Sequence, residues 1–408
     1  MNKRIIAIGL LFYVNVLGFA VLIPVLPFVL ENFGMGAIEY GVLLSLYPLF
    51  QFIGAPFLGT LSDHFGRRPL LLISQFGTML SWVIVAGSYF IPSIDFFGLP
   101  LPLFVFGLAR IVDGITGGNF SVASAYIADI TPRENRTKIF GLLGAIVGVG
   151  LITGPVLGGF LNSTPYGYFA VALFSCVLSL VTLILMYLFL SESLSAENRK
   201  QGFEFHLVRE LNIIGKIRKY NESNYIPLMF LIRAFFALAF SSYTSTIVLL
   251  MKDKFELNSA MIGLLFLLFG LYVIVNQSII APRMAKRFGE FKIFYYGQVI
   301  FILGLLLLAF VQNMSVLLIA VYFTNLGFST VFPTFKTLIT GAVSQQEQGT
   351  ISGIDESVMA GGSAIAPLLG SFIYKFTGQL SYAIFILFVL LPHIIIYLRT
   401  KKFIVKLV

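Results

Sequence analysis

Two residues of opposite charge lie three positions apart within a long apolar stretch of the chain. Arg110 and Asp113 interrupt the apolar run 102–128, which is long enough to cross a bilayer as a helix. Because each charge costs about 2.5–3.5 kcal/mol near the centre of a membrane, we expect neither side chain to face lipid. At this spacing they share one helix face and partly neutralise each other. Such a pair can carry a proton, or it can be a buried ion pair that only orients helices.

The second half of the chain holds further charges within apolar runs, namely Arg233, Lys336 and the adjacent acids Asp355 and Glu356. Neighbouring residues on a helix point about 100° apart, so at most one of the two acids can face the other half of the chain squarely. The other acid can pair with Arg233 or Lys336. Lys336 can instead extend to the membrane surface. The candidates for proton coupling are Asp113, Arg110, Asp355 and Glu356.

Uncharged polar side chains within the apolar runs are candidates for a substrate cavity. Amides and phenols there can hydrogen-bond a ligand, and they can equally join one helix to another. The candidates are Asn15, Tyr47, Gln51, Asn119, Tyr243, Asn276, Gln277 and Asn325.

Other kinds of chemistry find little support in the sequence. A single cysteine, Cys176, excludes an internal disulfide and a thiolate cluster, and the three histidines lie too far apart for metal-ligand spacing. The sequence contains no Gly-x-Ser-x-Gly, His-Glu-x-x-His or P-loop motif. We therefore expect no enzyme, no metal and no cofactor, and any active transport would have to use an ion gradient.

The charged and polar candidates named above all lie within apolar runs, so membrane-spanning helices must position them. Of the 408 residues, 58% are hydrophobic and 11% charged, whereas soluble domains carry about a quarter charged residues. Twelve apolar runs predict an all-α membrane protein with twelve transmembrane helices. The runs lie near 5–30, 40–58, 70–91, 102–128, 138–161, 166–190, 225–250, 259–281, 293–311, 314–340, 350–374 and 381–398.

The distribution of basic residues predicts the orientation of these helices. With a cytoplasmic N-terminus, all but six of the 27 lysines and arginines fall on the cytoplasmic side, as the positive-inside rule requires. Both termini are then cytoplasmic. The net charge of +9 therefore reflects topology, and we expect no nucleic-acid partner. The six exceptions are Lys252, Lys254 and Lys375 outside, and Arg110, Arg233 and Lys336 within helices.

A polar hinge, 59–68, joins the second and third apolar runs. Its Gly-x-Leu-x-Asp-x-x-Gly-Arg-Arg pattern resembles the signature loop of the major facilitator superfamily, in which the Asp and Arg latch the two halves on the cytoplasmic side. Asp129, at the end of the fourth run, can be an ordinary solvated helix end, or it can pair with Arg67 or Arg68 when the cytoplasmic side is shut. The implied conformational latch comprises Gly59, Asp63, Gly66, Arg67, Arg68 and Asp129.

Two further motifs resemble the drug:proton antiporter branch of the same superfamily. Arg110-x-x-x-Gly114 is similar to its fourth-helix motif, whose Arg is implicated in proton transfer. The fifth run contains many glycines, whose small size lets another helix pack closely against it. Its segment 154–159 is similar to the antiporter motif, which is common in exporters. Its matching residues are Gly154, Pro155, Gly158 and Gly159.

Several segments, among them 41–47 and 126–131, resemble the tetracycline efflux proteins. Those pumps carry acids in helices one, three and nine, where this chain has Asn15, Ser81 and Phe301. We therefore expect a different substrate and a different coupling acid.

The chain also contains an internal repeat. A shift of 212 residues places Thr350-Ile-Ser-Gly353 on Lys138-Ile-Phe-Gly141, and the Pro-Leu-Leu-Gly of 367–370 on the Pro-Val-Leu-Gly of 155–158. The major facilitator fold implied by the resemblance has two pseudo-symmetric six-helix bundles. We expect an N-terminal bundle at 1–190, a cytoplasmic linker at 191–223 and a C-terminal bundle with a short tail at 224–408.

The sequence therefore predicts a secondary active transporter, a proton-coupled antiporter that exports a small drug-like or metabolite substrate by alternating access. The alternative is a proton symporter or facilitator that imports a sugar, amino acid or siderophore. The expected partners are the substrate, protons and membrane lipids. We expect a monomer in a bacterial inner membrane.

Overall fold

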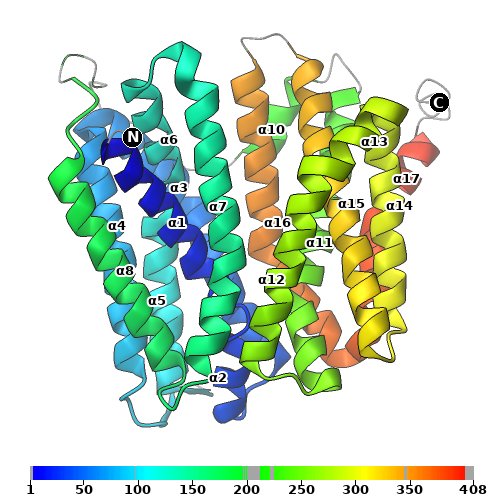
Figure 1. The fold of residues 1–408 in the computed structure, drawn as a ribbon, viewed down its shortest axis with the longest axis horizontal. Helices are drawn as coiled ribbons and strands as arrows, with labels where there is room; N and C mark the ends of the chain where they lie inside the picture. The colour runs from blue at the N-terminus through cyan, green and yellow to red at the C-terminus, as the bar shows by residue number, and fades with distance from the viewer. Residues whose placement is uncertain are drawn as a thin grey trace. The chain divides into compact units, whose positions relative to one another are not determined.

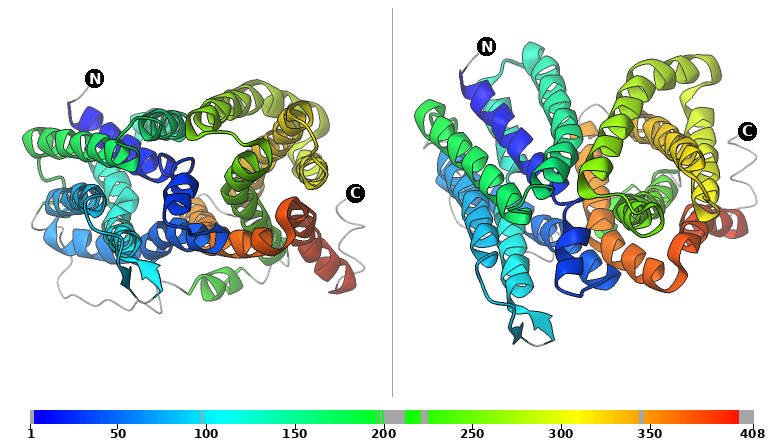
Figure 2. Two further views of the ribbon diagram at one scale, coloured as in Figure 1. Left: turned by 90° about the horizontal axis from the view of Figure 1, so that it is seen from below. Right: turned by 60° about the horizontal axis from the view of Figure 1, so that its bottom comes forward.

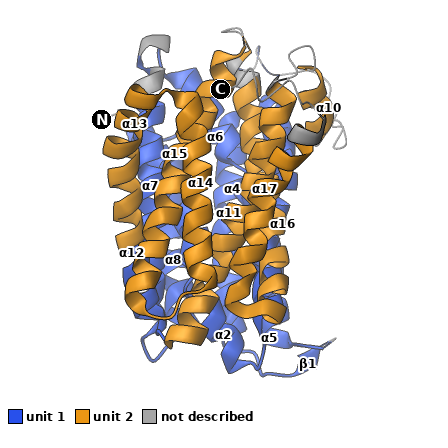
Figure 3. Cartoon of the chain, turned by 90° about the vertical axis from the view of Figure 1, so that its right-hand side faces the viewer, with its two compact units in different colours: residues 1–211, 257–267 blue, residues 212–256, 268–408 orange. Residues whose placement is uncertain are grey.

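The computed structural model consists almost entirely of long helices (Figure 1). It describes residues 3–96, 98–195, 197, 199, 212–220, 225–343 and 347–399. The chain divides into two compact units, Met1–Leu211 with Leu257–Leu267, and Asn212–Glu256 with Leu268–Val408 (Figure 3). The first turns of the eighth long helical segment therefore belong to the first unit.

The first unit contains long helices, two broken helices and a short β-hairpin. Its elements are α1 (Lys3–Ala20), α2 (Leu26–Asn32), α3 (Ala37–Phe65), α4 (Arg67–Ser88), β1 (Asp95–Phe96), β2 (Leu99–Pro100), α5 (Leu101–Gly117), α6 (Phe120–Ile130), α7 (Arg133–Asn162) and α8 (Tyr168–Phe189).

The second unit begins with a short helix and continues with long ones. Its elements, with the start of α12 shared with the first unit, are α10 (Ile213–Arg218), α11 (Tyr225–Phe255), α12 (Ser259–Val275), η2 (Asn276–Ile280), α13 (Ala281–Phe288), α14 (Glu290–Ala309), α15 (Met314–Gly341), α16 (Gln348–Thr377), η3 (Gly378–Leu380) and α17 (Ser381–Arg399).

The described residues contain eleven candidate membrane spans, judged by length and composition. The last of them, Ile351–Ile396, comprises most of two helices, α16 and α17, so each of the twelve predicted runs has a helical counterpart. The prediction of an all-helical membrane fold is confirmed, apart from the two-residue strands β1 and β2. Most of the predicted linker and the last nine residues lie outside the described part of the chain.

Three of the helical runs are interrupted. The first run splits into α1 and α2 around Pro24, which cannot donate a backbone hydrogen bond. The fourth run splits into α5 and α6 at Gly118 and Asn119. The eighth run contains the π-helix η2, and such turns often mark functional sites.

The two units share a packing pattern. In the first, α1 packs against α7, and α4 packs against α5 and α8; in the second, α11 packs against α16, and α14 packs against α15 and α17. Figure 2 shows these helices from two further sides. The corresponding pairs occupy equivalent positions in the internal repeat, so each half of the chain builds its own helix bundle in the same way.

Glycines bring helix backbones of the first unit into close contact. A Cβ atom on Gly118 would lie 2.7 Å from Cα of Ala55, and one on Gly114 would lie 2.7 Å from the Tyr47 carbonyl oxygen, so α5 lies directly against α3. Along α7, Gly150, Gly154 and Gly158 face α1 in the same way. At Gly144 and Gly148 of the same helix a Cβ atom would meet open space instead.

Candidate functional site

Arg110 and Asp113 form a buried ion pair on α5. The Arg110 Nη1 atom lies 2.8 Å from Oδ2 of Asp113, and each side chain is 3% exposed. The guanidinium carbon lies 4.7 Å from the ring centroid of Tyr47 on α3 and 5.8 Å from the ring of Trp82 on α4. The arginine is therefore held by one carboxylate and by the rings of two neighbouring helices, and cation–π attraction strengthens when the groups are desolvated.

Trp82 is part of this site, and the sequence analysis did not single it out. Its side chain is fully buried, and a Cβ atom on Gly18 of α1 would lie 3.4 Å from the indole ring. The glycine thus lets α1 approach the ring from the side. Thr78, one turn earlier on α4, lies beside the Asp113 carboxylate. Trp82 is the one tryptophan of the sequence, but nothing near it in the chain indicates that it contacts a cation.

Gln51 connects the aromatic wall of the ion pair to the helix break. Its Nε2 atom donates to the Tyr47 hydroxyl, at 3.1 Å, and to the Gly117 carbonyl oxygen, at 3.0 Å. Gly117 is the last residue of α5, where carbonyl groups lack partners within the helix. The Phe19 ring of α1 stacks on Tyr47 at a centroid distance of 6.0 Å. Tyr47 and Gln51 therefore belong to the same cluster as Arg110 and Asp113.

Asn15 and Asn119 bond directly to each other. The Asn15 Nδ2 atom donates to Oδ1 of Asn119 at 2.6 Å, and the Asn119 amide donates to the Ser74 hydroxyl at 2.5 Å. Ser74 in turn donates to the Thr116 carbonyl oxygen, also at 2.5 Å. This relay joins α1 and α4 to the break between α5 and α6. Both asparagines are buried, so in this conformation they act between helices.

The polar candidates of the second unit are dispersed. Tyr243 accepts a hydrogen bond from Thr324 at 2.9 Å and packs at 6.0 Å from the Phe301 ring. Asn325 donates to the Val321 carbonyl oxygen one turn earlier. Asn276 is fully buried at the start of η2, and its amide has no hydrogen-bond partner among the described residues. Gln277 is exposed.

The adjacent acids of α16 have different partners. Asp355 accepts from Nε of Arg233 at 2.8 Å, and the two side chains are 1% and 0% exposed. The Arg233 guanidinium lies 4.7 Å from the Phe332 ring and 4.8 Å from the Phe335 ring, both on α15. This ion pair lies between aromatic rings, like the one in the first unit.

The second acid of α16 pairs near the surface. The Glu356 carboxylate lies 3.5 Å from Nζ of Lys336, with side chains 66% and 45% exposed. An exposed pair of this kind contributes about 0–1 kcal/mol to stability. The two acids therefore occupy very different environments one residue apart.

The hinge between α3 and α4 forms a charge cluster. Nη1 of Arg67 lies 2.5 Å from Oδ1 of Asp63 and the same distance from the Ser62 hydroxyl oxygen. Its Nε atom lies 3.6 Å from Oδ2 of Asp129 at the end of α6, and Ser193 donates to the same carboxylate at 2.9 Å. The structure thus brings Arg67, Asp63 and Asp129 together.

Arg68 lies apart from this cluster and binds the end of α8. It donates from Nε to the Leu190 carbonyl oxygen at 2.8 Å and from Nη2 to that of Tyr187 at 3.1 Å. Its guanidinium also lies 5.5 Å from the Tyr187 ring. The terminal carbonyls of a helix lack intrahelical partners and carry partial negative charge, which explains the preference.

Glu192 is a further member of the hinge that the sequence analysis placed in the solvated linker. Its carboxylate accepts from the backbone N–H groups of Arg67, at 2.9 Å, and Arg68, at 3.2 Å. These are the first residues of α4, where N–H groups need acceptors and a negative charge is favoured. Gly66 has a φ of 103°, and a Cβ atom there would meet this carboxylate. The position therefore requires glycine. A Cβ atom on Gly59 would lie 3.6 Å from the Ser121 hydroxyl oxygen at the start of α6.

The glycine-rich segment of α7 contacts two elements. A Cβ atom on Gly158 would meet the Val21 backbone after α1, and one on Gly159 would meet the backbone of Ser259 at the start of α12. Ser259 also donates to the Gly159 carbonyl oxygen at 3.2 Å, and a Cβ atom on Gly263 would lie 2.6 Å from the Pro155 carbonyl oxygen. The segment therefore lets α7 lie between α1 and the first turns of α12.

Comparison with known proteins gives full-length matches. The Major Facilitator Superfamily model matches residues 8–354 and 229–404. The tetracycline resistance protein, class H, of Pasteurella multocida is 32% identical over 385 residues, which cover 92% of this chain and 90% of that protein. Multidrug resistance protein 2 of Bacillus subtilis (strain 168) is 26% identical over 367 residues, which cover 89% of this chain and 86% of that protein.

A solved structure shares the fold. The crystal structure of the human organic anion transporter MFSD10 (TETRAN) matches with a TM-score of 0.70 and 22% sequence identity, over 96% of this chain and 98% of that one. This match concerns the fold alone.

The two acids of α16 allow a matched test of ion-pair burial. We expect Asp355→Asn to lower the free energy of unfolding by about 3–5 kcal/mol, because it leaves the buried Arg233 without a counter-charge. Glu356→Gln removes an exposed partner, and we expect a change of less than about 1 kcal/mol. Thermal unfolding of the two purified variants in the same detergent measures the difference. Equal melting temperatures would contradict the assignment.

The role of Glu192 at the first turn of α4 can be tested in the same way. We expect Glu192→Gln to lower stability by about 0.5–2 kcal/mol, the usual effect of losing a helix cap, and to speed amide exchange in the first turn of α4. Glu197→Gln, an exposed acid in the same segment, is the control. Hydrogen exchange followed by mass spectrometry compares the variants. Unchanged protection at Arg67 and Arg68 in Glu192→Gln would rule out the cap.

Proposed function

Because the chain belongs to the major facilitator superfamily, a family of membrane transporters, we propose that it is a proton-coupled antiporter that exports a small molecule. It is a multi-pass membrane protein and a secondary transporter related to drug efflux proteins. The proposal adds the coupling ion, the direction of transport and the coupling residues. Its principal support is the Arg110–Asp113 pair, buried on α5 between the rings of Tyr47 and Trp82.

Asp113 is the residue that we propose to carry the proton. The Asp113 carboxylate is shielded from water and paired with Arg110. Its neutralisation therefore strongly changes the electrostatic attraction that acts on this arginine. Proton binding removes the charge that holds Arg110 on one side, while the rings of Tyr47 and Trp82 still hold it on the other. The guanidinium can then turn away from Asp113 without losing all its partners.

The coupling cycle follows from this exchange. A proton that reaches Asp113 from outside weakens its hold on Arg110 and releases a cationic or polar substrate from the cavity. After the two halves rearrange, Asp113 returns the proton to the cytoplasm and can bind substrate again. One proton that moves through about 100 mV supplies about 2.3 kcal/mol, enough for an approximately fiftyfold substrate gradient. No other energy source is then needed.

The substrate class follows from the relatives and from the differences between them and this chain. Two relatives are named for resistance to tetracycline and to multiple drugs, which supports export of a drug-like compound or metabolite. Asn15, Ser81 and Phe301 stand where the resemblance expects coupling acids, which supports a compound other than tetracycline. The proposed location is a bacterial inner membrane.

The other predicted residues keep secondary roles in this proposal. Asp63, Arg67 and Asp129 form a latch at one end of the first unit. The Asp355–Arg233 pair is the alternative proton site, with Glu356 beside it. The proposed substrate contacts are those cavity candidates that can turn toward the ligand as the bundles move. They are Asn15, Tyr47, Gln51, Asn119, Tyr243, Asn276, Gln277 and Asn325.

Transport by proteoliposomes tests the proposal. Liposomes with the full chain are loaded with a pH-sensitive dye and one compound from a panel of lipophilic cations, tetracycline and metabolites, and the outside is then acidified. We expect at least one compound to speed acidification of the lumen with wild type, and Asp113→Asn to lose this acceleration at least tenfold. Asp95→Asn, an exposed acid on the β-hairpin, should transport like wild type.

The possible outcomes distinguish the rival roles. Normal coupling in Asp113→Asn would show that Asp113 is structural and would move the proton site to Asp355 or Glu356. If no compound moved protons while an isotope-labelled compound still entered by exchange, the chain would be a facilitator and antiport would be wrong.

A further inference from the structure

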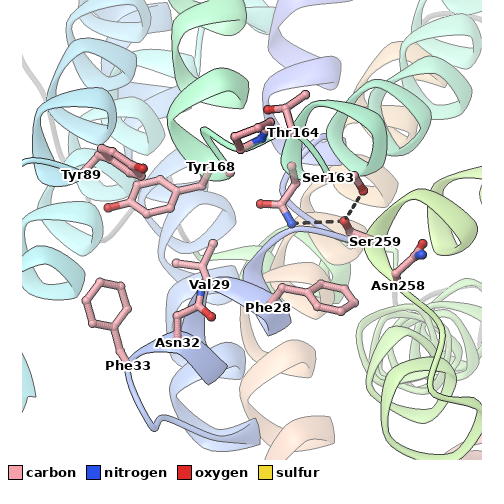
Figure 4. Close-up of a pocket in the computed structure, with 13 residues that line it drawn as sticks. Phe28, Val29, Asn32, Phe33, Tyr89, Ser163, Thr164, Tyr168, Asn258 and Ser259 are labelled. Carbon is pink, nitrogen blue, oxygen red and sulfur yellow. Dashed lines mark hydrogen bonds between the residues drawn. The ribbon is translucent and has the colours of Figure 1, made fainter.

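A cavity of about 680 Å³ lies in the first unit, at the opposite end of α4 from the Arg67 hinge. Four segments form its wall: the end of α2, the end of α4, the loop between α7 and α8, and the start of α12 (Figure 4). All of them belong to the same compact unit. Its volume suits a drug-sized ligand, for which pockets of about 300–1,000 Å³ are usual. The Arg110–Asp113 site does not contribute to this wall.

The chemistry of the wall is polar but uncharged. Asparagine, serine and threonine side chains and two tyrosine hydroxyls line it, and none of its lining residues is Asp, Glu, Lys, Arg or His. A charged ligand in this cavity would lose its hydration and find no opposite charge in the wall, which costs free energy. Amides and hydroxyls both donate and accept hydrogen bonds, so they match a ligand whose own groups do both. Alcoholic hydroxyl groups have this property.

Aromatic rings supply the second half of the wall. Phe28, Phe33, Tyr89 and Tyr168 line the cavity, and Figure 4 shows these rings around the hollow with the polar groups between them. The Tyr89 and Tyr168 rings meet edge to face at 5.4 Å. Rings of this kind offer apolar faces to a ring of the ligand. A ligand that has both a ring face and hydroxyl groups would therefore satisfy both parts of the wall.

Several polar groups of the wall have unused hydrogen-bonding capacity. The Asn32 amide and the Tyr89 hydroxyl make no hydrogen bond with any described residue. Asn258 uses its oxygen to accept from the Met261 backbone N–H at 2.9 Å, which leaves its NH₂ group. Asn162 donates to Ser259 at 3.2 Å, which leaves its oxygen. These donors and acceptors come from four separate segments, so a bound molecule would bridge them.

We propose that this cavity is a binding site for a neutral ring compound that carries several hydroxyl groups, such as a glycoside. The ring would lie against Tyr89 and Tyr168, and the hydroxyl groups would bond Asn32, Asn162 and Asn258. Such a group can come from a glycoside in solution or from the headgroup of a glycolipid. The site does not depend on the proposed proton coupling.

Equilibrium binding to the full chain in nanodiscs tests this site. Tritiated phenyl β-D-glucopyranoside is the probe, and phenyl β-D-glucuronide, which adds one carboxylate, is the charged analogue. We expect saturable binding of the glucoside and at least fivefold weaker binding of the glucuronide. Tyr89→Phe and Asn32→Ala should each weaken glucoside binding by about three- to tenfold, the effect of one hydrogen bond.

Matched controls keep the test specific. Tyr166→Phe removes a hydroxyl from the loop that contains Ser163, but this tyrosine is 63% exposed and outside the wall, so binding should not change. Asp113→Asn should also bind the glucoside like wild type, which separates this site from the transport proposal. Competition by a glucosyl diacylglycerol in the nanodisc would identify the lipid as the source, and lack of competition would identify the free glycoside.

Three results would overturn the proposal. The first is the absence of saturable glucoside binding to the wild-type chain. The second is glucoside binding that Tyr89→Phe, Asn32→Ala and Tyr166→Phe leave equally unchanged. The third is glucuronide binding as tight as that of the glucoside.

Discussion

The free energy of a charge inside a membrane governs the arrangement of both units. Among the described residues each unit has one buried arginine, and each of the two has the same kinds of partner: a carboxylate 2.8 Å away and two aromatic rings within 6 Å. An unpaired charge there would cost several kcal/mol. The ion pairs therefore fix which faces of α5, α11 and α16 turn inward, and the helices around them have to supply the rings.

Close helix packing makes these pairs possible. In the first unit, Gly114 and Gly118 bring α5 against α3, which puts Tyr47 over Arg110, while Gly18 lets α1 lie against Trp82. The fourth helical run is broken at Asn119, next to the close contact of Gly118 with α3. The Asn119 amide connects α1 to α4 through its hydrogen bonds with Asn15 and Ser74. The freed carbonyl of Gly117 is satisfied by Gln51. One set of residues thus provides the close packing, the hydrogen bonds and the burial of the charged pair.

The sequence predicted the parts of this arrangement that depend on local spacing. Arg110 and Asp113 pair because three residues separate them on one helix, and Asp355 and Glu356 diverge because neighbours on a helix must. Partners distant in the chain were predictable only where opposite charges stand within apolar runs or beside the hinge, as for Asp355 with Arg233 and Asp129 with Arg67. Nothing near Glu192 in the sequence indicates that it caps α4. Likewise, nothing near Trp82 indicates that its ring lies beside the Arg110 guanidinium. The break at Gly118 was missed because hydropathy runs continuously through it. The polar cavity beside Tyr89 was missed because its wall comes from four segments, each unremarkable alone.

The proposed coupling requires that Asp113 gains and loses a proton while Arg110 stays charged. Infrared difference spectra of the full chain measure the protonation of Asp113 directly when the pH is stepped across the range in which the protein transports its substrate. If Asp113 carries the proton, the carbonyl band of a protonated carboxylic acid is present in wild type and in Asp355→Asn and absent in Asp113→Asn. A band that survives in Asp113→Asn and disappears in Asp355→Asn would contradict it and place the proton in the second unit.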